Sequence, residues 1–162
     1  MNGKHGMDKI DCKILALLQE NGRMTNVKLA SEVGLSPPTV LERVRKLEDQ
    51  GIIRKYVALL DHDKVGKGLT AFVLVTLSYH SKRNIARIRK ELLHEPKVQE
   101  CYYLAGEGDF LLKVVVSDIA AYRDFLVSRL TGVEGVQRMR TMIVFDTLKH
   151  ETMIDVDQTQ EV

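Results

Sequence analysis

The stretch Ala30-Ser31-Glu32-Val33-Gly34-Leu35-Ser36-Pro37-Pro38-Thr39-Val40 decides the fold of the N-terminal third of the chain. Ala30 is small enough for a second helix to cross closely above it, and Gly34 suits a turn with a positive φ angle. Ser36 followed by Pro37 is typical of a helix start, where the missing proline N–H costs nothing. Val40 lies ten residues after Ala30, on the inner side of the next helix. This spacing predicts a helix-turn-helix.

Further helical patterns lie on both sides of this stretch. Residues 8–21 repeat apolar side chains at helical spacing, and Gly22 is expected to end that helix in a left-handed conformation. Thr25 is the expected cap of the second helix, and the third helix is expected to run to about residue 50 and to stop at Gly51. The predicted inward-facing residues of the first two helices are Ile10, Ile14, Leu17, Leu18, Val27, Leu29, Ala30 and Val33.

The third helix has an apolar side and an opposite side that combines short polar groups with cations. The first turns of such a helix enter the major groove of DNA. The candidate DNA contacts in this region are Ser36, Pro38, Thr39, Glu42, Arg43, Arg45 and Lys46. Of these, Thr39, Glu42 and Arg43 are expected at base edges, and the remaining two cations at phosphates. The alternative is a solvated helix in which Glu42 pairs with Lys46.

The run from Ile52 to Leu60 is rich in β-prone residues and predicts a wing strand beside the third helix. Arg54 and Lys55 would then lie near a phosphate backbone. The alternative is a linker strand whose two cations only solvate an edge.

The net charge of +2 hides a mild split along the chain. Residues 1–60 hold ten basic and seven acidic side chains, a net +3, and the remainder has a net charge of −1. The near-neutral total excludes a uniformly basic protein, but not DNA binding by one local face, because phosphates respond to the local field. The split agrees with the motif in placing DNA binding in the first 60 residues.

The sequence gives no sign of secretion, of a membrane span or of a metal site. The first nine residues contain no apolar signal segment, and the longest apolar stretch, 69–79, falls well short of the ~20 residues that span a bilayer. Cys12 and Cys101 form no CxxC pair, and the five histidines lack metal-ligand spacing. We therefore expect a cytoplasmic protein with no metal, no other cofactor and no membrane partner.

The remainder of the chain reads as a second domain. The expected order is a strand over 69–79, a helix over 82–94, strands over 98–104 and 110–116, a helix capped by Asp118, and a strand over 136–148. This order is typical of a ferredoxin-like βαββαβ unit. The first strand is apolar on both faces, which indicates a sheet covered on both sides by helices or by a partner subunit.

The predicted fold class is α+β, with a winged helix-turn-helix followed by a ferredoxin-like βαββαβ sensing domain. The expected boundaries are a DNA-binding domain over 1–60, a polar, glycine-bearing linker over 61–68, and an effector-binding and oligomerisation domain over 69–150. The polar C-terminal tail covers 151–162 and is expected to fray from Asp155.

One loop of the second domain, Gly106-Glu107-Gly108-Asp109, suggests ligand binding. Its two glycines can expose backbone N–H groups to a carboxylate, and Asp109 offers a counter-charge for an ammonium group. Together these features would suit a zwitterionic amino acid. The alternative is a hairpin turn that uses glycine and aspartate for geometry alone.

Both halves of the chain resemble one family, the Lrp/AsnC (leucine-responsive, feast/famine) transcription regulators. The matching stretches are DKIDCKIL at 8–15, NGR at 21–23, VGLS at 33–36, VLERVRKLE at 40–48, GII at 51–53 and GEGDFLLKV at 106–114. The resemblance covers nearly the whole chain in the family's order. It implies a winged helix-turn-helix joined to an effector-sensing domain, in a dimer that assembles into a higher oligomer, often an octamer.

The resemblance also implies a small-molecule site between sensing domains, near the glycine-rich loop. The residues that match this site are Leu104, Gly106, Gly108, Asp109, Thr141 and Met142. Glu107 stands at a position that varies in the family. Pro37-Pro38-Thr39 departs from the commoner start of the recognition helix, which leaves the operator sequence open.

The leading hypothesis is a sequence-specific DNA-binding transcriptional regulator whose DNA binding or assembly responds to an amino acid or a related small molecule. Its partners would be double-stranded DNA, the amino-acid effector and further copies of the chain. Two alternatives are an effector-independent architectural DNA-binding protein and a small-metabolite enzyme on the ferredoxin-like fold. Against the enzyme, the sequence has no nucleophile–base pair, no phosphate loop and no metal cluster, so we expect no catalytic residue.

Overall fold

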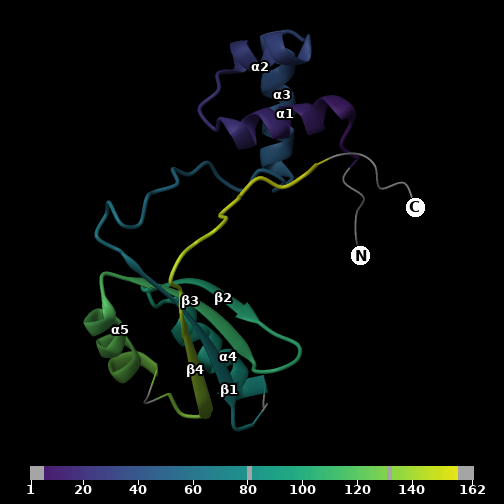
Figure 1. The fold of residues 1–162 in the computed structure, drawn as a ribbon. Coiled ribbons are helices and arrows are strands. Elements are labelled where there is room, and N and C mark those ends of the chain that lie inside the picture. Colours follow the sequence, from purple (N-terminus) through teal and green to yellow (C-terminus); the bar gives the residue numbers. More distant parts are fainter. Residues whose placement is uncertain (1–5, 80–81, 131–132, 157–162) are drawn as a thin grey trace. The chain divides into compact units, whose positions relative to one another are not determined.

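A computed structural model describes residues 6–79, 82–130 and 133–156 of the chain. The chain divides into two compact units (Figure 1). The head unit comprises Met1–Leu59 with Lys149–Val162, and the sheet unit comprises Leu60–Leu148. Within the described residues, no helix is long and apolar enough to cross a bilayer.

Three helices build the head unit: α1 (Lys9–Glu20), α2 (Asn26–Val33) and α3 (Pro37–Asp49). The predicted caps of α2 and α3 are confirmed, because the Thr25 side chain accepts from the Lys28 amide and the Ser36 side chain accepts from the Thr39 amide. Gly34 ends α2 with a φ of 71°, as the helix-turn-helix spacing predicted. Local chemistry thus fixes both ends of the turn.

The core of the head unit lies where the three helices meet. Its buried side chains are Ile14, Leu15, Leu29, Ala30, Val40, Val44 and Leu47. Two details of the prediction are wrong. Val27 is 67% exposed rather than buried. Gly22 has no positive φ, because α1 already ends at Glu20, where the Asn21 amide donates to the Leu17 carbonyl.

The predicted wing strand over residues 52–60 is also wrong, since this segment forms no strand. The amides of Ile52 and Ile53 donate to the Leu47 carbonyl, and both side chains pack on the head core. Beyond them, the Tyr56 hydroxyl donates to the Glu48 carboxylate at 3.0 Å. The described head unit contains no strand that could pair with this segment, and without one, β propensity alone does not produce a strand.

The C-terminal segment returns to the head unit over residues 149–156, and the rest of the tail that was expected to fray lies outside the described residues. The Gln19 side chain of α1 donates to the Ile154 carbonyl at 2.9 Å and accepts from the Ile154 amide at 2.7 Å. Val156 packs against the head core. One glutamine amide thus binds both backbone groups of Ile154, much as a neighbouring strand would. The last residues of the sequence, 157–162, lie outside the described part of the chain.

The sheet unit has the predicted βαββαβ order. Its elements are β1 (Leu69–Leu77), α4 (Lys82–Leu93), β2 (Val98–Tyr103), β3 (Phe110–Val116), α5 (Ile119–Phe125) and β4 (Val136–Ile143). The α5 helix continues as a π-helical segment over Leu126–Leu130. The strand order is β2-β3-β1-β4, and all neighbours are antiparallel, which confirms the ferredoxin-like fold.

The two faces of this sheet differ. Side chains of α4 and α5 cover one face, where Ala71, Val73, Val75 and Leu77 of β1 are buried together with Ile88, Leu92, Tyr122 and Phe125. The opposite face, here called the open face, carries Phe72 and Leu74 of β1, which are only half-buried, and the 43%-exposed Met142. Within the described residues, helices therefore cover one face of the sheet, whereas the sequence predicted a cover on both faces.

The last strand is shorter than the predicted 136–148. Its final ladder residue, Ile143, pairs with Ala71, and the Val144 amide donates to the Thr70 carbonyl at 3.0 Å. Because β1 begins at Leu69, no partner backbone remains for residues 145–148. Phe145 is fully exposed as a result.

Candidate functional site

The exposed side of α3 collects most of the predicted DNA contacts on one surface. Pro38, Thr39, Glu42, Arg45 and Lys46 are all exposed, and the buried Val40, Val44 and Leu47 lie on the other side of the helix. The Thr39 hydroxyl is hydrogen-bonded to the Ser36 hydroxyl at 2.8 Å, which orders the first turn. The α3 surface therefore presents short polar groups at its start and cations further along.

Arg43 differs from its neighbours, because it is held inside the head unit. Its Nη1 lies 2.7 Å from Asp8 Oδ2 and 2.7 Å from Asp11 Oδ1. The two aspartates also form a reciprocal capping box at the start of α1, in which each side chain accepts from the backbone N–H of the other. Asp11 is only 7% exposed. We call this group, Asp8, Asp11 and Arg43, the α1–α3 clamp.

Hydrogen bonding in the clamp favours the charged forms of Asp8 and Arg43. The backbone N–H of Asp11, and then the Arg43 guanidinium, lower the pKa of Asp8. Asp11 and then Asp8 raise the pKa of Arg43. The guanidinium is thus neutralised within the head unit. The predicted base contact of Arg43 stays a prediction, whereas its contact with α1 is an observed feature of the fold.

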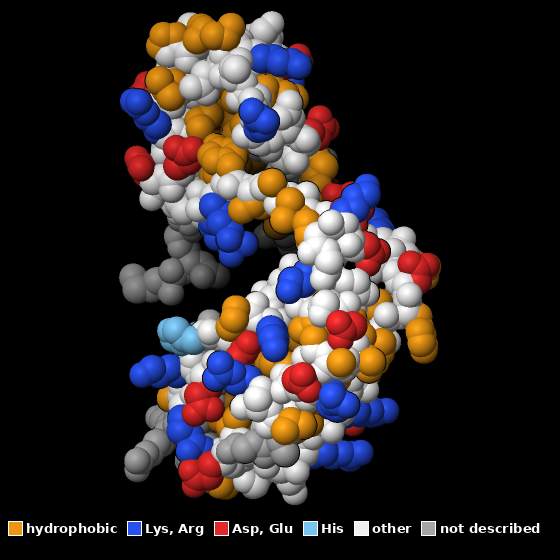
Figure 2. Space-filling view, turned by 90° about the vertical axis from the view of Figure 1, so that its left-hand side faces the viewer, with side chains coloured by type: hydrophobic (Ala, Val, Ile, Leu, Met, Phe, Trp, Pro, Cys, Tyr) orange, Lys and Arg blue, Asp and Glu red, His pale blue; other side chains and the backbone are white. Residues whose placement is uncertain are grey.

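Arg54 and Lys55, the predicted phosphate contacts beyond α3, are exposed in irregular backbone. On the face shown in Figure 2, the described basic and acidic side chains are interspersed over both units rather than gathered by sign. That face therefore carries no broad basic surface.

The glycine-rich loop between β2 and β3 folds tightly onto β1. Gly106 and Gly108 have φ values of 129° and 77°, which favour glycine. The Leu104 amide donates to the Asp109 carbonyl at 2.8 Å and closes the loop. A Cβ on Gly108 would lie 2.6 Å from Leu74 Cδ1, so the loop backbone lies directly against the open face.

Asp109 is the buried anchor of this loop, at 7% exposure. Its Oδ2 accepts from the Leu77 amide at 2.7 Å, just beyond the last β1–β3 pair, Val75 with Phe110. Its own amide donates to the Val75 carbonyl. The carboxylate therefore satisfies a backbone group of β1 that β3, which begins at Phe110, does not reach, a role that sequence reasoning did not predict.

Thr141 and Met142 are not brought together. Adjacent residues of a strand point to opposite faces, and here Thr141 pairs with the buried Val73, whereas Met142 pairs with the half-buried Phe72. The Thr141 hydroxyl is hydrogen-bonded to the Tyr122 hydroxyl of α5 at 2.7 Å. Within one chain, the two side chains cannot line the same face of the sheet.

The open face also holds an ion pair that the sequence did not reveal. Arg140 of β4 lies 3.6 Å from Glu107 of the loop, and both side chains are largely exposed. The strand alternation of β4 could have placed Arg140 on the face of Met142, but nothing local indicates that the loop reaches it. The loop, Leu74, Arg140 and Met142 thus gather at one part of the open face.

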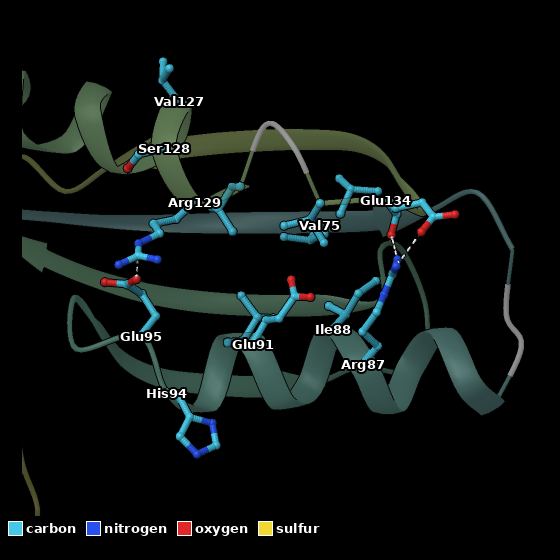
Figure 3. A pocket seen from close by; sticks show the side chains of 14 residues that line it. Val75, Arg87, Ile88, Glu91, His94, Glu95, Val127, Ser128, Arg129 and Glu134 are labelled. Carbon is cyan, nitrogen blue, oxygen red and sulfur yellow. Dashed lines mark hydrogen bonds and ion pairs between the residues drawn. The ribbon is translucent and has the colours of Figure 1, made fainter.

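A second feature, not predicted, lies on the helix-covered face. A groove of about 660 Å³ opens between α4 and the π-helical segment, and charged side chains cross it from wall to wall (Figure 3). No group of three or more histidine, cysteine, aspartate or glutamate side chains in the described residues could hold a metal ion.

Comparisons with known proteins agree with this architecture. Residues 70–154 match the model of the Lrp/AsnC ligand binding domain, and residues 7–54 match a model described as winged helix-turn-helix DNA-binding. The leucine-responsive regulatory protein of Rhizobium meliloti (strain 1021) is 41% identical over 150 residues, which cover 93% of this chain and 96% of that protein. The Bkd operon transcriptional regulator of Pseudomonas aeruginosa is 38% identical over 135 residues, 83% of this chain and 88% of that protein.

Solved structures give the same result. A transcriptional regulator of Neisseria meningitidis, in complex with L-methionine, superimposes with a TM-score of 0.86 at 40% identity, covering 91% of this chain and 96% of that one. AsnC of E. coli superimposes with a TM-score of 0.83 at 26% identity, covering 91% and 97%. With both units matched in order, the chain belongs to the Lrp/AsnC family of transcriptional regulators, with a helix-turn-helix for DNA and a ligand-binding domain.

Proposed function

We propose that the exposed side of α3 reads the operator, with Thr39 and Glu42 at base edges and Arg45 and Lys46 at phosphates. The observation that supports this most is the sorting of side chains on α3, where every buried residue is apolar and the exposed side mixes short polar groups with cations. Ser36 and Pro38 shape the turn that enters the groove, and Arg54 and Lys55 contact the flanking backbone.

Salt-dependent DNA binding tests this surface. Each phosphate contact releases close to one counterion from DNA. It therefore steepens the plot of log affinity against log salt concentration by about 1. Arg45→Ala and Lys46→Ala should each lower that slope by about 1, uniformly across sequences. Lys90→Ala, which removes an exposed cation from α4, is the control and should leave the slope unchanged. Unaltered slopes in both α3 variants would contradict the proposed surface.

Sequence specificity is measured in the same assay. DNA from upstream of the protein's own gene should compete much better than random DNA of equal length. An architectural DNA-binding protein would give nearly equal competition by the two.

The effector that we propose is an α-amino acid bound at the glycine-rich loop. In support, the regulator from N. meningitidis is in complex with L-methionine, and the R. meliloti relative is named leucine-responsive. The loop offers the amides of Gly106 and Gly108 to a carboxylate. Asp109 already accepts from the Leu77 amide, but a carboxylate has lone pairs for further donors, including a ligand ammonium.

Calorimetric titration with each of the twenty amino acids tests the effector. Apolar amino acids should bind, because Leu74 and Met142 supply apolar surface beside the loop. Heats indistinguishable from dilution for all twenty would favour a regulator that needs no effector.

We also propose that the open face is covered by a second copy of the chain, in a dimer that assembles further, towards an octamer. The half-buried Phe72 and Leu74, with the exposed Met142, favour an apolar partner surface. A second copy would also allow Thr141 and Met142 from different chains to line one cleft. Light scattering measures the assembly size. The relatives are regulators, and we propose no catalytic activity for this chain.

A further inference from the structure

The groove between α4 and the π-helical segment has two closed ends. At one end, Arg87 of α4 lies 2.5 Å from Glu134, from Nη1 to Oε2, and its Nη2 donates to the Glu134 carbonyl. At the other end, Arg129 Nε lies 3.1 Å from Oε2 of Glu95, just beyond α4. Each pair joins the α4 side to the opposite wall (Figure 3). The pairs therefore set the length of the groove.

Glu91 stands between the two pairs. Arg87, Glu91 and Glu95 follow one another at intervals of four residues, so they lie along one side of the helix and its end. Figure 3 shows the Glu91 carboxylate pointing into the space between the ion pairs. The charge of Glu91 acts on Arg87, one helical turn earlier, but the hydrogen bonds of Arg87 go to Glu134. Among the described residues, Glu91 is thus the member of this row that forms no ion pair with the opposite wall.

The groove also offers donors and an apolar floor. Arg129 uses Nε for Glu95, which leaves its terminal N–H groups, the part of a guanidinium that binds carboxylates. The floor is formed by Val75, Ile88, Leu92, Leu130 and Val136. His94 adds no charge opposite Glu91, because its ring points away and its Nδ1 is hydrogen-bonded to the Lys90 carbonyl. The five charged side chains of the groove sum to −1, which favours a ligand with a cationic group.

We propose that this groove is a second small-molecule site, which takes an α-amino acid with an apolar side chain. The ligand ammonium binds Glu91, its carboxylate binds the terminal N–H groups of Arg129, and its side chain lies on the apolar floor. A volume of about 660 Å³ is within the usual range of ligand sites.

The site is distinct from the glycine-rich loop. Val75 points to the helix-covered face, whereas Gly108 packs on Leu74 at the open face. The two sites can therefore be filled and disrupted separately.

Titration of the full-length protein with L-leucine and L-methionine tests the proposal, with Glu91→Gln as the decisive variant. Loss of a charge-assisted hydrogen bond should weaken leucine binding at one class of sites by at least about tenfold. The same variant should leave 4-methylpentanoate, which is leucine without its ammonium group, bound as in the wild type. Arg129→Gln should weaken both ligands, because both carry a carboxylate.

Glu20→Gln makes the same chemical change at an exposed position of α1 and is the matched control. Thermal unfolding of each variant checks that the fold is retained. The groove is refuted if the leucine isotherm of Glu91→Gln matches that of the wild type, or if neither amino acid binds. Unchanged binding in Glu91→Gln with loss in Asp109→Asn would refute the groove and leave the loop site standing. DNA binding in the absence of amino acid reports separately on the regulator itself.

Discussion

Replacement of Arg43 by alanine is expected to lower the free energy of unfolding of the head unit by about 1 to 2 kcal/mol. The guanidinium binds Asp11 and Asp8, and Asp11 is nearly buried at the start of α1. Without Arg43, the Asp11 carboxylate keeps only its bond from the Asp8 amide. DNA affinity should fall as well, because the clamp holds α3 against α1.

The salt dependence of DNA binding separates this role from a direct contact. If Arg43 only positions α3, Arg43→Ala should reduce affinity and leave the salt slope unchanged, whereas Arg45→Ala should lower the slope by about 1. A lower slope in Arg43→Ala would instead assign Arg43 to a phosphate.

Asp11→Asn should change DNA affinity in opposite directions, depending on whether Asp11 acts through its charge alone or through the clamp. As a change of charge alone, it removes a negative group near DNA and should strengthen binding. As a change to the clamp, it removes an acceptor from Arg43 and should weaken both binding and thermal stability. Stronger DNA binding by Asp11→Asn, with unchanged stability, would contradict the positioning role of the clamp.

The clamp also predicts an acid dependence. The folded pKa of Asp8 is lowered, first by the Asp11 N–H and then by Arg43, so its contribution to stability is fully present above its ordinary pKa. That contribution is lost as the pH falls through the lowered value. In Arg43→Ala the pKa of Asp8 should be lowered less. The free energies of unfolding of the variant and the wild type should therefore differ less in acid than near neutral pH.

Replacement of Gly108 by alanine is expected to destabilise the sheet unit by about 2 to 4 kcal/mol. Its φ of 77° is costly for a residue with a Cβ, and that Cβ would lie within 3.1 Å of three Leu74 side-chain atoms. The loop would have to lift from the open face, and Asp109 would be drawn from the Leu77 amide. Thermal unfolding should show a lower Tm, and amino-acid binding at the loop should be lost.

Two further variants divide this effect into its causes. Gly106 also has a positive φ, but a Cβ added there would meet no neighbouring atom. Gly106→Ala should therefore lower the free energy of unfolding only by the cost of that φ for alanine, about 1 to 2 kcal/mol. Leu74→Ala removes the side-chain atoms that a Cβ on residue 108 would meet. The double variant Leu74→Ala, Gly108→Ala should therefore lose less stability than the sum of the two single variants. Equal Tm values for Gly106→Ala and Gly108→Ala would contradict close packing of the loop on Leu74.

The features that the sequence predicted well are those with short-range causes. Thr25, Ser36 and Gly34 act within one helical turn of their own positions, and their chemistry can be read locally. The alternation of apolar side chains in β1 likewise predicted a sheet with two apolar faces. Gly22 was misread because its position after an apolar run is compatible with several chain paths.

The features that the sequence could not predict depend on distant segments. The clamp joins Asp8 to Arg43, and Gln19 binds the backbone of Ile154. The Ile52–Leu60 run has strand propensity but no strand to pair with. The separation of Thr141 from Met142 was open to prediction, because residues next to each other in a strand face opposite sides. The resemblance places both at a cleft between sensing domains, which stays a prediction.

The return of residues 149–156 to the head unit also bears on the order in which the protein can mature. The helix-turn-helix lies in the first third of the chain, and its helices can form early during synthesis. The contacts of Gln19 with Ile154, and of Val156 with the head core, become available only after the sheet unit between them has been translated. A nascent chain that stalls before residue 149 would therefore carry all of α3 and still lack part of its support.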